Sequence, residues 1–279
     1  MTTQTVDYGP RLIAHPTGAL RAAVLVAPRA AIEDAAPLQG EPSAIYARAV
    51  MQHGILERTL TYFGVETQVL QAPEGDPLAT AVADAAIALE SGVAIMRPWS
   101  MTRRPESPWI ERECERLDLP ISAHILSPGL LDGGDVLLVA DAVFIARSRR
   151  SNSLGRGAFA EIARAHGLRT FEIAIADGTS LRSVAGPVSA DTIVVAPQFA
   201  DPQAFRDAGF ATIVLERTEE RQGAGVFALG ERHVLADLRY PNAVAQLRKS
   251  GITVEAIDLY DFGKIGLVPA NLVLATKRL

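Results

Sequence analysis

Residues 130–152 read LLDGGDVLLVADAVFIARSRRSN, which is two apolar runs between an Asp-Gly-Gly-Asp turn and a cluster of arginines. The apolar runs at 136–139 and 143–146 have the length of strands, and the short break between them predicts a β-hairpin. A buried carboxylate without a partner costs free energy. Asp132 and Asp135 beside a buried hairpin therefore indicate either a tight turn whose amides they bind or a ligand site.

The composition excludes several classes of protein. The chain has 279 residues, 48% of them hydrophobic, and a net charge of −5, which argues against general nucleic-acid binding. Cys114 is the sole cysteine, so neither an intramolecular disulfide nor a cysteine metal cluster can form. No pair of histidines has metal-ligand spacing, and we expect no metal and no cofactor. No apolar run approaches the roughly 18 residues of a membrane span and no secretory signal is evident, so we expect a cytoplasmic protein.

The order of elements along the chain is repetitive. Each repeat of about 50 residues holds a strand pair, a helix and a further strand, and about five such repeats predict one domain over residues 1–279, with a flexible segment at 1–15. Residues 80–98 fit either one helix or two short strands joined at Glu90-Ser91-Gly92. The other predicted strands are 20–27, 65–72, 171–176, 192–197, 211–216, 225–236 (a hairpin), 253–259 and 267–275, and the predicted helices are 43–63, 106–117, 155–166, 200–209 and 243–251.

Four stretches resemble one family. They are DAAIALESGVAIMRPWSMTRRPE at 84–106, the 130–152 stretch, IADGTSLRS at 175–183 and YDFGKIGLVPANLVLA at 260–275. In this order they are similar to the dimethylarginine dimethylaminohydrolase branch of the amidinotransferase and arginine deiminase superfamily. The resemblance runs from about Leu20 to the C-terminus. It implies a pentein-type α/β propeller with five-fold pseudosymmetry, built from ββαβ units.

The resemblance also implies a set of site residues. In that family a cysteine near the C-terminus attacks the guanidinium carbon and a histidine acts as general acid and base, while acidic residues hold the guanidinium nitrogens and arginines bind the substrate carboxylate. Asp84 and Asp132 stand at the acidic positions, and Arg103 and Arg150 at the carboxylate-binding positions. Arginine suits that task because its planar guanidinium donates two parallel hydrogen bonds.

The sequence departs from the family at the catalytic pair. Ser180 stands at the histidine position and Asn271 at the cysteine position, while Gly266 and Ala83 replace two further acids. Asparagine is not a nucleophile of this kind, and a serine does not titrate near neutral pH. Cys114 lies in a charged helical stretch, away from the nucleophile position.

Three hypotheses for function follow. The first is an enzyme that acts without a thiol on a small zwitterionic or carboxylate-bearing compound, with Asp132 as base and Ser180 and Asn271 as hydrogen-bond partners. His124, which precedes the Asp132 turn, is a further candidate base. The second is a pseudoenzyme that binds a guanidino or amino-acid ligand or a protein partner. The third is a conventional dimethylarginine hydrolase. A small molecule, as substrate or ligand, is the expected partner, and the resemblance also allows a homodimer.

Overall fold

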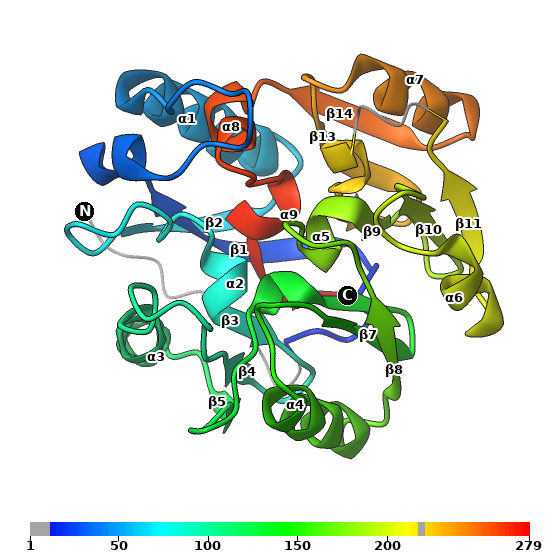
Figure 1. Ribbon diagram of the computed structural model, residues 1–279, viewed down its shortest axis with the longest axis horizontal. Helices are drawn as coiled ribbons and strands as arrows, with labels where there is room; N and C mark the ends of the chain where they lie inside the picture. The colour runs from blue at the N-terminus through cyan, green and yellow to red at the C-terminus, as the bar shows by residue number, and fades with distance from the viewer. Residues whose placement is uncertain (1–11, 217–220) are drawn as a thin grey trace.

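The computed structural model describes residues 12–216 and 221–279, which form five three-stranded sheets arranged around a central axis (Figure 1). In every sheet the first two strands are antiparallel and the third is parallel to the second. The five ββαβ units predicted from the sequence are therefore confirmed. The sheets are β15 (Leu274–Arg278), β1 (Leu20–Ala27) and β2 (Glu66–Gln71); β3 (Ala86–Ala88), β4 (Val93–Ile95) and β5 (Ile121–His124); β6 (Val136–Val139), β7 (Ala142–Arg147) and β8 (Arg169–Ala174); β9 (Ala185–Pro187), β10 (Thr192–Val195) and β11 (Ala211–Val214); and β12 (Phe227–Gly230), β13 (His233–Asp237) and β14 (Thr253–Ile257).

The first unit is completed by the far end of the chain. Strand β15 pairs antiparallel with β1, and the register places Leu274 opposite Val24 and Arg278 opposite Leu20. Because the last strand of the chain supplies the first strand of this unit, the ring of sheets closes on itself. The two ends of the described chain are thereby held in one sheet.

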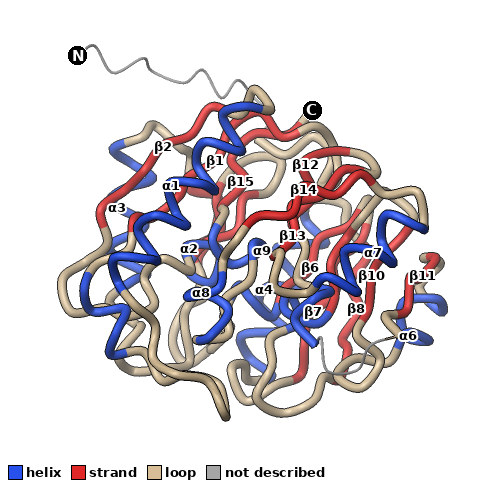
Figure 2. Tube along the Cα trace, turned by 90° about the horizontal axis from the view of Figure 1, so that it is seen from above, coloured by secondary structure: helices blue, strands red, loops and turns tan. Residues whose placement is uncertain are grey.

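Two classes of helix occupy different places in each unit. The longer helices connect the second strand to the third and lie on the outside, and Figure 2 shows α1 against β1 and β2. A helical turn near the axis precedes each first strand. The outer helices are α1 (Tyr46–Tyr62), α3 (Glu106–Arg116), α4 (Ser153–Ala165), α6 (Pro202–Asp207) and α7 (Pro241–Lys249); the axial turns are α2 (Val82–Ala85), η2 (Gly133–Asp135), α5 (Leu181–Val184), η3 (Arg221–Ala224) and α9 (Pro269–Leu272); η1 (Ala30–Asp34) and α8 (Tyr260–Lys264) complete the set.

The axial turns pack against one another. Turn α2 contacts η2 and α9, and α5 contacts η2 and η3. The contact between η2 and α2 is close enough to require glycine, because a Cβ at Gly133 would lie 2.2 Å from the carbonyl oxygen of Ala83. The Gly-Gly pair of the opening stretch therefore lets one unit approach the next, and it sets the spacing of the side chains around the axis.

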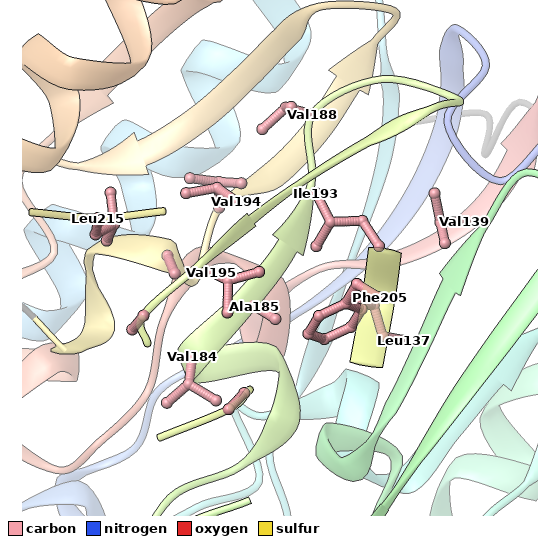
Figure 3. Close-up of a cluster of buried hydrophobic side chains, with 14 of the residues drawn as sticks. Leu137, Val139, Val184, Ala185, Val188, Ile193, Val194, Val195, Phe205 and Leu215 are labelled. Atoms are coloured by element: carbon pink, nitrogen blue, oxygen red, sulfur yellow. The ribbon is translucent and has the colours of Figure 1, made fainter. Parts of the chain in front are cut away.

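Apolar side chains fill the space between the sheets and the outer helices. Figure 3 shows one such cluster, in which Leu137, Ile193 and Phe205 come from three different elements. Phe144 lies beside Phe205, with ring centroids 4.8 Å apart. Full burial of a side chain of this size contributes about 1.5–3 kcal/mol. The clusters therefore stabilise the sheets whose first strands follow the axial turns.

Two predictions about elements are decided by the structure. Residues 80–98 contain the short strands β3 and β4, which supports the two-strand alternative, although the turn α2 precedes them. The strand predicted over 267–275 is wrong in its first half, because residues 269–272 form α9 and the strand begins at Leu274. Pro269 occupies the first turn of α9, where its missing amide proton costs nothing. Residues 1–11 of the expected flexible segment lie outside the described residues.

Candidate functional site

The axial turns bring together side chains that are far apart in the sequence. Asp84 lies on α2, Asn271 on α9, and Ser180 and Asp132 immediately before α5 and η2. Asp84 and Asn271 are 187 positions apart, yet the Asn271 Nδ2 donates a hydrogen bond of 2.9 Å to Asp84 Oδ1. Since each turn occupies an equivalent place around the axis, their polar residues converge at one end of the channel.

A cavity of about 110 Å³ opens at this convergence. Five of the six predicted site residues line it, namely Asp84, Arg103, Arg150, Ser180 and Asn271. Asp132 is not among the lining residues. Leu38, Leu78, Ile265 and Leu267 supply apolar wall. Val268 instead packs toward η3, where a Cβ on Gly225 would meet its side chain at 2.6 Å, so the cavity is not plugged by the 267–269 segment as a whole.

Arg103 is held in a buried cluster of charges. Its Nε and Nη2 donate to the two carboxylate oxygens of Glu106 at 2.5 and 2.8 Å, and its Nη1 donates to Asp84 Oδ2 at 2.9 Å. Burial alone would lower the pKa of Arg103, but the carboxylates of Glu106 and Asp84 raise it well above its usual range. The resemblance predicts that Arg103 binds a substrate carboxylate. In the structure its guanidinium is engaged by acids of this chain, and that role stays a prediction.

Glu106 is a member of the cluster that the sequence reasoning missed. It begins α3 three residues after Arg103, and its side chain is 1% exposed. A spacing of three residues at a helix start brings two side chains to the same face, so the Arg-x-x-Glu pattern is the signal that could have found it. Within the RRPE segment at 103–106, Glu106 therefore fixes the position of the Arg103 guanidinium.

Asp132 lies beside this cluster and is almost completely buried. Its Oδ1 accepts a hydrogen bond of 3.0 Å from the backbone amide of Trp99, and only 2% of the residue is exposed. Burial raises the pKa of Asp132 to about 7, an effect that the positive charges of Arg103 and Arg150 oppose. A carboxylate that titrates near neutral pH is suited to proton transfer. The Trp99 indole ring itself belongs to a half-exposed side chain.

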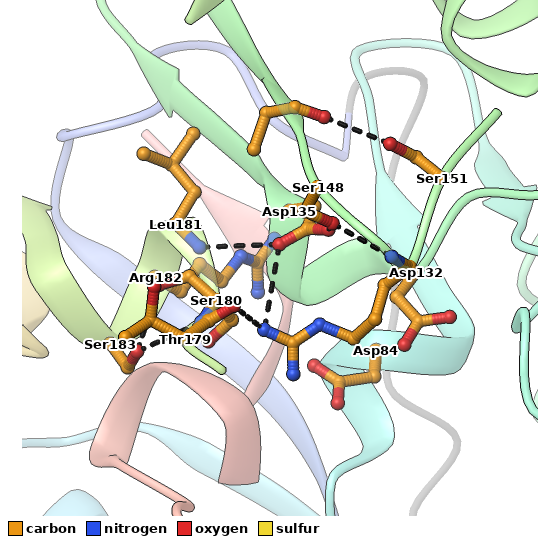
Figure 4. A network of polar contacts seen from close by, with 12 residues as sticks. Asp84, Asp132, Asp135, Ser148, Ser151, Thr179, Ser180, Leu181, Arg182 and Ser183 are labelled. Carbon is orange, nitrogen blue, oxygen red and sulfur yellow. Dashed lines mark hydrogen bonds and ion pairs between the residues drawn. The ribbon is translucent and has the colours of Figure 1, made fainter. Parts of the chain in front are cut away.

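Asp135 and Arg150 connect η2 to the turn before α5. Figure 4 shows Asp135 facing Leu181, which begins α5. Asp135 accepts hydrogen bonds from the hydroxyl of Ser148 and from the amide of Leu181. Arg150 donates to the carbonyl of Thr179, and its Nη2 lies 3.8 Å from Asp135 Oδ1. These contacts give Asp135 a structural role. The Arg150 side chain is 30% exposed, so it lies at the mouth of the cavity.

Ser180 and Asn271 are positioned by their own turns. The Ser183 hydroxyl accepts from the amide of Ser180 and donates to its carbonyl. Asn271 Oδ1 accepts from the amide of Val268 at 3.1 Å while its Nδ2 binds Asp84. Both polar atoms of the Asn271 amide therefore have partners within the protein, and its side chain orients Asp84 toward the cavity.

The remaining candidate groups lie elsewhere. Cys114 is 1% exposed on the buried face of α3, and burial, reinforced by neighbouring glutamates, raises the pKa of its thiol to about 12. His124 lies 2.8 Å from Glu111 and does not line the cavity, so the structure does not support it as the base. Among the described residues, no group of three or more His, Cys, Asp or Glu side chains could hold a metal ion. Across residues 12–216 and 221–279, none of the helices is long and apolar enough to cross a membrane.

Comparisons with known proteins identify relatives over most of the chain. No protein-family model matches the sequence. The dimethylarginine dimethylaminohydrolase of Pseudomonas aeruginosa is 26% identical over 226 residues, which cover 81% of this chain and 87% of the relative. The enzyme of the same name from Streptomyces coelicolor is 27% identical over 207 residues, 72% of this chain and 76% of the relative.

Solved structures agree with the fold. A cysteine-to-serine mutant of the Pseudomonas aeruginosa enzyme in complex with citrulline superposes with a TM-score of 0.84 at 23% identity, covering 92% of this chain and 99% of that one. The N-terminal domain of a cyanobacterial arginine dihydrolase bound to its substrate gives 0.80 at 18% identity, covering 92% and 98%. These likenesses establish the five-unit propeller. The chain therefore has the pentein fold and is similar in sequence to dimethylarginine dimethylaminohydrolases.

Proposed function

We propose that this protein binds a small zwitterionic compound at the axial cavity, with a guanidino or amino group inside and a carboxylate at the mouth. The observation that carries the proposal is the division of charge along the cavity. Asp84 lines the interior and is only 7% exposed, whereas Arg150 lies at the mouth and is more exposed. A ligand with opposite charges at its two ends would complement both.

The size of the cavity supports a compact cationic group. Its volume of about 110 Å³ corresponds to roughly four water molecules at about 30 Å³ each. A guanidinium group has four heavy atoms and fits this space, while the rest of an amino acid would extend toward Arg150. The relatives are named for guanidino substrates, which agrees with this ligand class.

Turnover without a thiol is a second candidate function, and Asp132 is the observation that favours it. Its pKa of about 7 would let it accept a proton from water at neutral pH. The burial of Cys114 and the raised pKa of its thiol support a reaction that does not use a thiolate nucleophile. A pseudoenzyme would keep the binding and lack this step. A conventional thiol hydrolysis has the least support.

Calorimetric titration of ligand pairs tests the binding. Guanidinoacetate and arginine would be compared with guanidinium chloride and acetate, each of which carries one end of the proposed ligand. We expect a zwitterion to bind at least tenfold more tightly than either fragment, because each lost charged contact costs about 1.5–3 kcal/mol. Mass spectrometry of the same mixtures would detect any product and so separate an enzyme from a pseudoenzyme.

Three variants locate the ligand. Asp84→Asn is expected to remove the preference for a cationic group, and Arg150→Gln the preference for a carboxylate. Arg149→Gln is the matched control, because the Arg149 side chain is 81% exposed and its ion-pair partner, Asp177, is exposed as well. Equal affinity for zwitterions in all three variants and the parent would overturn the proposal.

A further inference from the structure

A second cavity lies on the same axis, on the side of the turns from which the strands leave. Its volume is about 90 Å³. Its walls come mainly from the first strands of the units, with Ile87 on β3, Leu137 on β6, Phe227 on β12 and Leu274 on β15. None of these residues lines the Asp84 cavity. The two cavities are therefore separate spaces in the channel, and the far one is largely apolar.

Two arginines face this apolar space. Arg182 donates from Nε to the carbonyl of Val136 at 2.8 Å and from Nη1 to that of Ala270 at 3.0 Å. Arg278 donates to the carbonyls of Gly18 and Ala228 at 2.9 and 2.6 Å. Arg278 is only 4% exposed. The hydrogen-bond partners of both guanidinium groups are backbone carbonyls, and neither group forms an ion pair with a carboxylate of the described residues.

Neither guanidinium has a carboxylate of the described residues within ion-pair distance. Burial lowers the pKa of Arg278 to about 9, and the neighbouring positive charge of Arg182 contributes to the same shift. Burial likewise lowers the pKa of Arg182 to about 10, although Asp84 opposes the effect. Both groups still carry their charge at neutral pH. Burying charges without a counter-ion is costly, so an anion between these groups would gain more here than at the surface.

We propose that this far cavity, lined by Arg182, Arg278 and the apolar ends of the first strands, binds a short-chain carboxylate. Two guanidinium groups can hold the carboxylate by charge-assisted hydrogen bonds. The apolar walls would contact an alkyl chain, which a phosphate or sulfate ion does not have. The volume equals about three water molecules, so it accommodates a chain of a few carbons.

Titration calorimetry with butyrate tests this site, with sodium chloride keeping the ionic strength constant. Butyrate is expected to bind more tightly than acetate or inorganic phosphate, since it alone supplies both a carboxylate and a sufficient apolar chain. Arg278→Gln should weaken butyrate binding by tenfold or more, because it removes one charged contact. Ala275→Leu is a second variant, which fills the cavity from β15 and leaves both arginines in place. Circular dichroism of each variant without ligand would establish that it is folded.

The controls distinguish the far cavity from the Asp84 cavity. Arg150→Gln, at the mouth of the Asp84 cavity, and the surface variant Arg149→Gln are both expected to bind butyrate as the parent does. Loss of butyrate binding in Arg150→Gln with retention in Ala275→Leu would place the anion at the other site and overturn the proposal. Tighter binding of phosphate than of butyrate, or no binding of butyrate, would also overturn it. A failure of the zwitterion titrations leaves this test intact, because the two cavities share no lining residue.

Discussion

The two ends of the axial channel differ in how their arginines are neutralised. At the end formed by the turns, Arg103 has Glu106 and Asp84 as partners and Arg150 has Asp135 nearby. At the end formed by the strands, Arg182 and Arg278 donate their hydrogen bonds to backbone carbonyls alone among the described residues. The end formed by the turns, called the acid-rich end, thus holds four buried acids (Asp84, Glu106, Asp132 and Asp135), whereas no acid lines the far cavity. Asp84 favours a cationic group in the first cavity, beside Arg103 and Arg150, and the arginines Arg182 and Arg278 favour an anion in the second.

Arg182 lines the far cavity, and its neighbours in the sequence, Ser180 and Ser183, line the Asp84 cavity. It binds the carbonyl of Ala270, next to Asn271, and the carbonyl of Val136, next to Asp135. The negative charge of Asp84 acts on Arg182 and raises its pKa against the effect of burial. The turn α5 therefore contributes side chains to both cavities, Arg182 to the far one and Ser183 to the Asp84 cavity. What each cavity can bind therefore depends on the local hydrogen-bond and charge partners of its arginines. The position of an arginine in the propeller does not decide it.

The largest effect is expected from removing the charge at the acid-rich end. Arg103→Met would leave Glu106 and Asp84 buried without their cation, and we expect the free energy of unfolding to fall by about 3–5 kcal/mol. Chemical denaturation measures the change. Arg116→Ala is the control, since its ion pair with Glu113 is at the surface and its removal should change stability by less than about 1 kcal/mol. Equal losses in the two variants would contradict the buried cluster.

The spacing of the axial turns is tested next. In Gly133→Ala the new Cβ would lie 2.2 Å from the Ala83 carbonyl oxygen, so η2 and α2 must separate. We expect a loss of about 2–3 kcal/mol and weaker zwitterion binding, because Asp84 lies on the displaced turn. Gly157→Ala is the matched control on the exposed side of α4, where no atom lies within 4 Å, and it should gain up to about 1 kcal/mol. An unchanged stability of Gly133→Ala would show that the turns are not in tight contact.

The acid-rich end should also show a distinct pH dependence. The folded-state pKa of Asp132 is about 7, above its ordinary value, so the native state retains a proton that the unfolded state has lost. Asp132 therefore makes folding less favourable as the pH rises from about 4 to above 7. Because an asparagine side chain does not titrate, the Asp132→Asn variant should gain stability relative to the parent over this range, by about 2–4 kcal/mol at pH 8 compared with pH 4.

Asp141 provides a control of opposite sign for that measurement. Its hydrogen bond and charge interaction with Arg169 lower its pKa, so its contribution to stability is present above its unfolded pKa and is lost as the pH falls. Asp141→Asn should therefore lose stability at neutral pH relative to acid. Thermal unfolding between about pH 2 and pH 8 records both variants, because the contribution of Asp141 is lost only below about pH 4. A difference between Asp132→Asn and the parent that does not vary with pH would contradict the raised pKa of Asp132.

The smallest effect is expected at the cysteine, which belongs to neither cavity. Cys114→Ala removes one buried sulfur, and we expect a loss of about 1 kcal/mol. Ligand affinity, and any turnover found by mass spectrometry, should stay within about twofold of the parent, because the thiol lies away from both sets of lining residues. Loss of turnover in this variant, with ligand affinity intact, would show that the thiol takes part in the reaction.

Much of the fold could be predicted from sequence patterns, because the periodicity of apolar residues depends on residues that are close together in the chain. The strand predicted at 20–27 coincides with β1, and the helix predicted over 43–63 contains α1. The prediction of one strand over 267–275 was wrong because the apolar residues of this segment belong to two elements, the turn α9 and then β15. An apolar run of this length has the same composition whether it forms a buried turn or a buried strand.

The sequence predicted which types of side chain form the candidate site. It did not predict which of these side chains pair with one another. The resemblance directed attention to Asp84, Arg103, Arg150, Ser180 and Asn271, all of which line one cavity. It did not reveal that Arg103 is clamped by Glu106, or that Asp132 lies behind the cavity lining. The far arginines had no signal at all in the sequence, since the partners of Arg278 are carbonyls from β12 and from the loop before β1.

The sequence by itself determined the repeating order of strands and turns, the presence of a single cysteine and the chemical types of the candidate site residues. The tertiary structure alone decided which charges are paired and which are buried without a counter-ion. The reason is physical: periodicity acts between neighbours along the chain, whereas electrostatic free energy depends on distance in space and on removal from water. Closure of the ring by β15 brought the last turn beside the second unit's turn and so placed Asn271 on Asp84.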